Sequence, residues 1–396
     1  MEGSNGKNNS IRPPIGMTSK EIWEQFQEPQ LNRWAFQNIE KFISHDMIRR
    51  SGAPFRLPRD LHDISEIQFI WDDGNTRTVG ECLSYLMVDG LIAIKDGIIL
   101  AEDYFNGMQP DRPHLLFSAS KPFAGALITS LIHKGSIHSE DDRIIKYIPE
   151  LNEGAFYDVS IRNLLDMQSG VDFRHLGDRD ELERASGFKP PILDESIHSL
   201  INNLHKKKLP AGYLTDYNSI NTDLLSLLIT RITGEPASIL LQRDIFEPMG
   251  AEFDAYAIKD QQGINELGGG LAITVRDLVK FGIVLLNCGV IGNRRVLPDS
   301  ILARIFNTAE PEKWRKGWLA SLTPQAKAYR AQLYLCADKF DEGAIFACGN
   351  YGQALYINPN HKAVIGLLST YQTAVDLPRF NTQMAMLKAI STHIYR

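Results

Sequence analysis

The stretch FSASKPFAGALITSLIHKG, residues 117–135, carries the pattern that decides how the chain folds. Small and apolar residues predominate from Ser118 to about His133, which predicts a helix, and Gly135 supplies a stop signal. Ser118 and Lys121 are three residues apart, so their side chains would share one face at the start of that helix. This S-x-x-K spacing offers a candidate nucleophile beside a candidate base.

Proton transfer decides whether such a pair is reactive. A serine hydroxyl is a poor nucleophile unless a neighbouring base takes its proton. A lysine can do so where burial or nearby cations lower its pKa, and N–H groups at a helix start can stabilise an oxyanion. The spacing also occurs by chance, and a capping Ser118 beside a solvated Lys121 would give the same pattern. Ser120 is a rival serine, but neighbouring helical residues point apart.

Strand patterns lie on both sides of this helix. Leu91–Lys95 and Ile98–Phe105 are β-rich runs joined by Asp96-Gly97, a hairpin signal because both turn residues accept positive φ. Residues 141–250 are mostly helical in pattern, and a further helix is expected after Thr274 as its N-cap. Four later strands and a last helix are predicted at Leu333–Ala337, Ala344–Cys348, Gln353–Ile357, Ala363–Ser369 and about Pro378–Ile394.

This order of elements predicts an α+β fold. An antiparallel sheet would be built from both chain ends, with flanking helices and an inserted, mostly helical region. We divide the chain into a disordered tail (1–18), a first part of the α/β domain (19–140), a mainly helical region (141–265) and a second part of that domain (266–396).

Composition narrows the possible functions. The chain has 43% apolar and 23% charged residues, as soluble globular proteins do. The chain has 42 Lys and Arg and 48 Asp and Glu, which give a net charge of −6. It lacks the excess of basic residues that is typical of a nucleic-acid-binding protein. No signal peptide is visible, and no apolar run reaches the length of about 18 residues that spans a membrane. We therefore expect a cytoplasmic protein with neither nucleic acid nor a membrane as partner.

Neither metal nor cofactor is expected. The ten histidines show no zinc-ligand spacing, and Gly268-Gly269-Gly270 lacks the context of a phosphate loop. The four cysteines are far apart in sequence and are expected to be free thiols: Cys82, Cys288, Cys336 and Cys348.

Two other segments could join the Ser118 pair. Tyr217-Asn218-Ser219 lies in a turn-rich loop before an apolar helix, where a phenol near a lysine could relay a proton, or simply pack. Residues 348–353, Cys-Gly-Asn-Tyr-Gly-Gln, place two glycines at a strand, which indicates either a close approach or a bulge. An exposed N–H there could complete an oxyanion hole with the N–H of Ser118.

These segments, in this order, resemble the serine β-lactamase and penicillin-binding-protein superfamily, near class C β-lactamases and family VIII esterases. Residues 159–170, 221–234, 246–250 and 269–282 are similar to further motifs of that branch. Residues 27–36, 147–151 and 217–223 are most similar to its 6-aminohexanoate-oligomer amidases. The resemblance implies a serine hydrolase that acts on a small-molecule ester or amide.

The resemblance also implies roles for single residues. Ser118 would be acylated, and Lys121 with Tyr217 would move the proton. The backbone N–H groups of Ser118 and Asn350 would stabilise the oxyanion. The remaining expected substrate contacts are Ser219, Tyr351 and Gln353.

The charged loop Asp172–Phe188 differs from that of the similar amidases, and two motifs also depart from the branch. Ser219 stands where many members have asparagine, and Ala347-Cys348-Gly349 replaces the strand motif that carries a cation. Without that cation we expect esters or amides rather than β-lactams, unless Arg330 or Lys316 supplies the charge. An acyltransferase, a β-lactamase and a binding module without turnover remain alternatives, and a homodimer is compatible with the sequence.

Overall fold

The computed structural model describes residues 15–173, 179–298 and 300–395. Its main sheet has the strand order β11-β12-β13-β14-β15-β4-β5, and every neighbouring pair is antiparallel. The strands are β4 (Val88–Lys95), β5 (Ile98–Tyr104), β11 (Ala326–Arg330), β12 (Leu333–Cys336), β13 (Ile345–Gly349), β14 (Gln353–Asn358) and β15 (Ala363–Ser369). Because β4 pairs with β15, both chain ends build one sheet, which confirms the predicted α+β fold.

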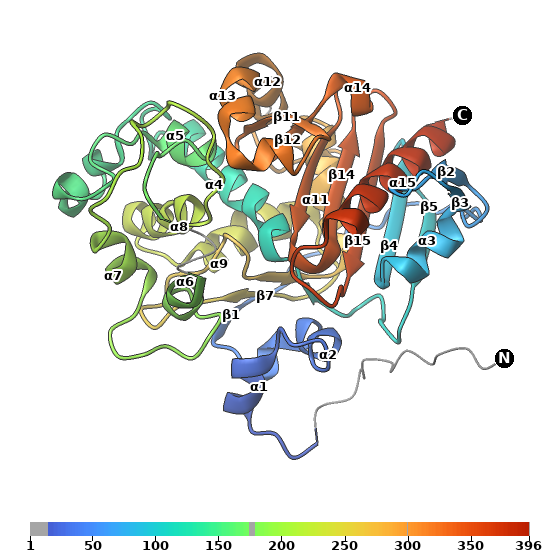
Figure 1. Ribbon diagram of the computed structural model, residues 1–396, viewed down its shortest axis with the longest axis horizontal. Helices are drawn as coiled ribbons and strands as arrows, with labels where there is room; N and C mark the ends of the chain where they lie inside the picture. The colour runs from blue at the N-terminus through green and yellow to red at the C-terminus, as the bar shows by residue number, and fades with distance from the viewer. Residues whose placement is uncertain (1–14, 174–178, 299, 396) are drawn as a thin grey trace.

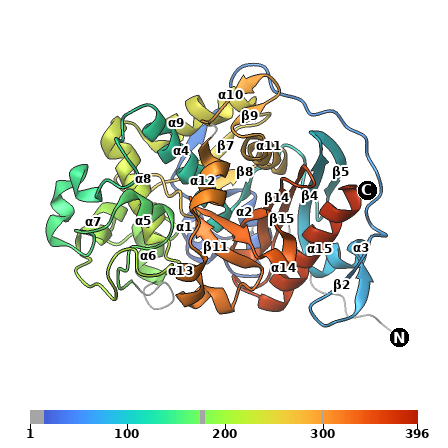
Figure 2. The ribbon, with the colours of Figure 1, turned by 90° about the horizontal axis from the view of Figure 1, so that it is seen from above.

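Helices cover both faces of this sheet. Figure 2 shows the strands between α11 (Val275–Leu286) on one side and α15 (Leu377–Tyr395) on the other. Thr274 caps α11 by accepting a hydrogen bond from the backbone N–H of Asp277, as predicted. The hairpin between β4 and β5 turns at Asp96 and Gly97, whose φ angles are 50° and 79°. The short Asp-Gly signal was therefore sufficient to locate this turn.

A second sheet was not predicted. It has the order β1-β7-β8-β6, with β1 (His45–Ile48), β6 (His114–Leu115), β7 (Ala255–Ile258) and β8 (Leu271–Ile273). Because β7 belongs to residues 141–265, that region is not purely helical. Each of these strands has four residues or fewer, too few for an alternating pattern to stand out in sequence.

The helical region lies beside the main sheet (Figure 1). Its central helices are α4 (Lys121–His133) and α8 (Ile220–Thr233), which ends at Gly234 with a φ of 70°. The surrounding helices are α5 (Ile161–Leu165), α6 (Arg179–Ala185), α7 (Ile197–Asn202), α9 (Ala237–Leu241), α10 (Glu247–Met249) and the 3₁₀ or π turns η3 (Ile144–Lys146), η4 (Pro149–Glu153) and η5 (Gln242–Phe246).

The remaining elements lie at the edges of these layers. They are α1 (Ser19–Gln25), α2 (Asn32–Phe36), η1 (Ile39–Lys41), β2 (Gln68–Ile70), β3 (Thr76–Thr78), α3 (Val79–Tyr85), β9 (Val290–Ile291), β10 (Arg294–Arg295), α12 (Ser300–Thr308), α13 (Pro311–Lys316), η6 (Trp318–Ser321) and α14 (Asp338–Asp341). Two turns, η2 (Phe117–Ser120) and η7 (Asn350–Gly352), belong to the site described below.

The expected tail is shorter than predicted where the structure describes it. Thr18 caps α1 in a capping box with Glu21, so it is part of the fold, while residues 1–14 lie outside the described residues. In the described part of the chain, no single helix is long and apolar enough to cross a membrane. Two helical segments joined by a sharp bend, Ile220–Thr233 and Ala237–Met249, are together long and apolar enough for a membrane span, by length and composition only.

Candidate active site

Ser118 lies in a strained turn rather than in the helix itself. The predicted helix start is the 3₁₀ turn η2, and α4 begins only at Lys121. Phe117, directly before Ser118, has a φ of 47°, a left-handed conformation that costs energy in a bulky residue. Its ring packs against Phe36 and Tyr351, with centroids 4.9 and 5.0 Å away. This packing holds the turn that presents Ser118.

Lys121 is enclosed and surrounded by oxygen atoms. Its side chain has 1% relative exposure, and its Nζ donates to Ser118 Oγ at 3.0 Å and to Ser219 Oγ at 3.1 Å. Nζ also donates to the carbonyl of Gly268. Ser219 is the N-cap residue of α8, yet its hydroxyl does not cap the helix. Ser219 therefore holds the lysine rather than the helix end.

Tyr217 approaches Lys121 with its ring. The ammonium lies 5.3 Å from the ring centroid, a cation–π distance. The same ring contacts Tyr329 and Tyr334, at centroid distances of 5.5 and 6.0 Å. Among the described hydrogen bonds, none joins the Tyr217 phenol to Ser118 or Lys121. The structure thus brings Tyr217 to the site without the expected phenol contact.

The end of β13 closes one side of the site. A Cβ on Gly349 would meet the Leu116 carbonyl oxygen at 2.2 Å, so only glycine permits this approach to the η2 turn. Asn350 follows and lines the same pocket as Ser118. Within the described chain, no backbone carbonyl outside regular elements accepts from the N–H of either Ser118 or Asn350. The assignment of these two N–H groups as oxyanion donors stays a prediction.

Two of the expected substrate contacts have other partners. Gln353 is fully buried, and its side-chain amide donates to the carbonyl of Ser369 at 2.7 Å and accepts from the N–H of that residue. Its contacts fix the loop instead of reaching a substrate. Tyr351 is also buried, and its hydroxyl donates to Gln27 Oε1 at 3.1 Å. We therefore correct both roles from substrate contact to loop support.

The pocket at Ser118 is narrow, with a volume of about 70 Å³. Its walls come from α6 and its neighbourhood, with Leu182, Glu183, Ser186 and Phe188, and from Gln27 before α2. Gln27 donates to Glu183 at 3.2 Å and so ties the N-terminal segment to that wall. Sequence reasoning did not assign these residues to the site. Except for Gln27, they lie in the segment 172–188, and its difference from the loop of the similar amidases was the only sequence signal for them.

The two replacement cations considered from sequence lie elsewhere. Arg330 is buried in an ion-pair network with Asp166 at 2.8 Å and Glu140 at 2.6 Å. Lys316 lies over the ring of Tyr213, 4.9 Å from its centroid. Neither lines the Ser118 pocket, and no other arginine or lysine is among its described lining residues.

Two buried carboxyl groups, Asp223 and Glu266, lie behind Lys121 and were not predicted. A Cβ on Gly268 would stand 2.5 Å from Glu266 Oε1 and 3.0 Å from Asp223 Oδ1, so both groups reach the peptide that accepts from Lys121. No described donor serves either oxygen of Asp223. Burial raises the pKa of Asp223 well above its ordinary value, and the charge of Glu266 raises it further.

Glu266 has more partners than Asp223 that stabilise its carboxylate form. Burial raises its pKa as well, but the hydrogen bond with Asp223, the Lys121 charge and the N–H groups of Gly269 and Gly270 oppose that rise. The consistent assignment is a protonated Asp223 that donates to a Glu266 carboxylate. The pair then carries one negative charge that balances the Lys121 ammonium.

Metal ligation has no support in the described residues. They contain no group of three or more His, Cys, Asp or Glu side chains placed to hold an ion. The four cysteines are free thiols, as expected.

Comparison with known proteins agrees with this geometry. A sequence model of the beta-lactamase family matches residues 89–385. The chain belongs to the beta-lactamase family. This beta-lactamase family member is 25% identical to the 6-aminohexanoate-dimer hydrolase of Paenarthrobacter ureafaciens over 367 residues, 91% of each chain.

Solved structures are similar to this chain over most of its length. A putative 6-aminohexanoate-dimer hydrolase from Bacillus anthracis superimposes with a TM-score of 0.83 and 26% identity, over 96% of this chain and 98% of that one. A family VIII carboxylesterase superimposes with a TM-score of 0.55 and 14% identity, over 76% and 92%. The resemblance drawn from the sequence motifs is confirmed.

The carboxyl pair gives a testable pH dependence. Replacing Glu266 by Gln removes a buried carboxyl group that interacts with the Lys121 ammonium. We expect the acid limb of the kcat/KM profile for an ester substrate to move down by about one pH unit, or about 1.4 kcal/mol.

Asp223→Asn is the matched control. It keeps a donor to Glu266 and leaves the negative charge in place, so the limb should stay near its wild-type position. An acid limb that moves upward in Glu266→Gln, or equally in both variants, would contradict the assignment.

Proposed function

We propose that this chain is a serine hydrolase that cleaves an ester or amide bond of a small molecule through an acyl-enzyme on Ser118. The observation that carries the proposal is the 3.0 Å contact between Lys121 Nζ and Ser118 Oγ, at a pocket that Asn350 also lines. A lysine placed there can act on the hydroxyl proton, which is what an unreactive serine requires.

Acylation follows from this contact. When Lys121 is neutral, the hydrogen bond reverses and Ser118 donates its proton to Nζ as Oγ attacks the carbonyl carbon. The N–H groups of Ser118 and Asn350 stabilise the oxyanion, and each such donor contributes about 3–4 kcal/mol in well-studied enzymes. The tetrahedral intermediate then collapses. The alcohol or amine leaves with a proton from Lys121 or, through a small ring movement, from Tyr217.

Deacylation repeats the steps with water. Lys121 accepts a proton from the water that attacks the acyl carbonyl, and returns it to Ser118 Oγ as the acid leaves. The three acceptors around Nζ and the Glu266 carboxylate hold the protonated lysine between these transfers. The same residues serve both half-reactions.

The pocket favours a neutral group next to the scissile bond. Phe117, Leu182 and Phe188 give it apolar walls, and Lys121 is its neighbouring cation. A β-lactam carboxylate would lie there without a charged partner, and a buried unpaired carboxylate is costly. The similar hydrolase from Paenarthrobacter is named for a dimer of 6-aminohexanoate. We therefore take linear amides, with short esters, as the first substrates to test.

The Ser118–Lys121 pair predicts reaction with a fluorophosphonate probe. Labelling should be abolished in Ser118→Ala and slowed by about 10²–10⁴-fold in Lys121→Ala, because the serine then has no base. Mass spectrometry of the labelled peptide and the labelling rate measure both effects. Lys134→Ala, at the exposed end of α4, is the control and should react at the wild-type rate. Near-normal labelling of Lys121→Ala would remove lysine from the mechanism.

Tyr217→Phe separates the ring from the phenol. The variant keeps the stacking and the cation–π contact but removes the proton-carrying oxygen. If the phenol protonates the leaving group, kcat on an amide should fall at least about tenfold more than kcat on p-nitrophenyl acetate, whose leaving group needs no proton. Equal losses on both substrates would restrict Tyr217 to positioning Lys121.

Substrate class is tested by direct competition. Short-chain p-nitrophenyl esters should exceed a chromogenic cephalosporin in kcat/KM by at least about tenfold, or about 1.4 kcal/mol of barrier. The Ser118→Ala variant controls for spontaneous hydrolysis of both substrates. A cephalosporin that matches the esters would show that a cation reaches the pocket during turnover.

A further inference from the structure

A second, larger cavity lies away from Ser118. Its volume is about 700 Å³, and it shares no described lining residue with the Ser118 pocket. It opens beside β5, the edge strand of the main sheet. The segment around Arg59 to His62 pairs with β5 only as far as Leu100, so the face beyond is left uncovered. We call this space the Arg33 cavity, after its one lining arginine.

Arg33 has hydrogen-bond donors that are not used. Its side chain has 5% relative exposure, and its Nε lies 3.1 Å from Asp89 Oδ1 without forming a hydrogen bond. Among the described residues, none accepts from its two terminal nitrogens. Neither terminal nitrogen is fully enclosed by protein, and Arg33 lines the cavity. A buried guanidinium aimed into a cavity is suited to bind a carboxylate in a bidentate manner.

Asp89 does not accept hydrogen bonds from the terminal nitrogens of Arg33, because other donors already occupy its oxygens. Asn106 donates to Asp89 Oδ1 at 3.1 Å, and the Thr370 hydroxyl donates to Oδ2. His114 Nε2 lies 3.6 Å from Oδ2, and His114 is not among the residues that line the cavity. Asp89 therefore anchors Arg33 from behind and leaves the guanidinium fork free in front.

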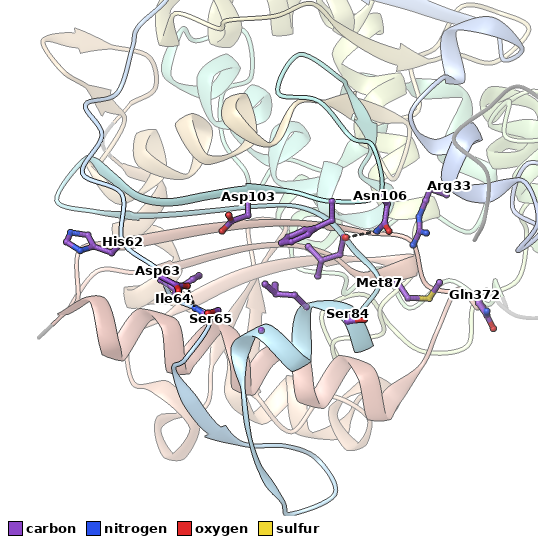
Figure 3. A pocket seen from close by; sticks show the side chains of 14 residues that line it. Arg33, His62, Asp63, Ile64, Ser65, Ser84, Met87, Asp103, Asn106 and Gln372 are labelled. Carbon is purple, nitrogen blue, oxygen red and sulfur yellow. Dashed lines mark hydrogen bonds between the residues drawn. The ribbon is translucent and has the colours of Figure 1, made fainter. Parts of the chain in front are cut away.

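The opposite end of the cavity is acidic. Figure 3 shows Arg33, Asn106 and Gln372 at one end, and Asp63 and Asp103 at the other. Neither Asp63 nor Asp103 has an ion-pair partner among the described residues. Partial burial raises the pKa of Asp103, and the neighbouring charges of Asp63 and Glu102 raise it further. His62 is the one basic side chain among the described lining residues at this end, and its ring nitrogen Nε2 faces Asp60 at 3.4 Å, so neither Asp63 nor Asp103 is neutralised there.

The two ends are separated by a partly apolar wall. Leu83 and Phe105 line the cavity between them. Asp103 lies near the end of β5, whereas Asn106 lies in the turn that follows the strand, with a φ of 53°. A simple anion would meet the two aspartates, and a simple amine would meet Arg33. Only a ligand with both charges, held apart by an apolar spacer, satisfies both ends.

We propose that the Arg33 cavity binds a linear ω-amino acid, with its carboxylate on Arg33 and its ammonium between Asp63 and Asp103. The spacer lies along Leu83 and Phe105. This site is independent of acylation at Ser118, since binding breaks no bond and uses none of the pocket residues there.

Calorimetry with the full-length chain tests this assignment. The probes are 5-aminopentanoate, 7-aminoheptanoate and 9-aminononanoate, which contain no bond that the enzyme could hydrolyse. Heptanoate and heptylamine are the controls with one charge. At least one ω-amino acid should bind at least tenfold more tightly than both of these controls. No detectable binding at millimolar concentration, or equally tight binding of heptanoate, would overturn the proposal.

Variants locate the ligand without disturbing the buried Arg33–Asp89 pair. Asp103→Asn removes an exposed charge, and Ser84→Trp fills the cavity from an exposed position on α3. Each should weaken binding at least tenfold, while Asp141→Asn, an exposed aspartate elsewhere, should not. Fluorophosphonate labelling of Ser118 should proceed at an unchanged rate with the ligand bound. Binding that survives both cavity variants, or that blocks labelling, would assign the ligand to another place.

Discussion

The burial of the Lys121 ammonium is the constraint on which the site depends. A lysine enclosed to this degree needs an acceptor for each of its three protons and a compensating charge nearby. Ser118, Ser219 and the Gly268 carbonyl provide the acceptors, and each comes from a different segment of the chain. The Asp223–Glu266 pair provides the charge. Any displacement of α4, α8 or the glycine segment would leave this charge unsatisfied.

Close backbone contact is the second constraint. The end of β13 touches the η2 turn because Gly349 has no side chain, and this brings Asn350 next to Ser118. Two bulky residues with left-handed φ angles flank the contact, Phe117 and Tyr351. Their rings pack against each other and against Phe36. Packing energy from this aromatic cluster offsets the backbone strain, as is common where a turn must present a reactive group.

The N-terminal segment connects the two cavities. Gln27 forms part of the wall at Ser118 and joins Tyr351 to Glu183. A few residues later, Asn32 donates to the carbonyl of Tyr371, and Arg33 faces the other cavity. A short piece of chain that lies before the family match at residue 89 thus lines both cavities. Variation in this segment could therefore alter specificity while the shared fold stays the same.

Several features of the fold rest on local patterns and could be predicted before the structure was known. The Asp96-Gly97 turn, the Thr274 cap and the C-terminal strands depend on neighbouring residues and were found where they were expected. The S-x-x-K spacing likewise placed Ser118 and Lys121 within hydrogen-bond distance. The surroundings of these two residues could not be predicted in this way. The Asp223–Glu266 pair, the Arg330 network and the loop roles of Tyr351 and Gln353 join residues far apart in the chain, and burial, which sets their charge and their partners, arises only when those segments pack together.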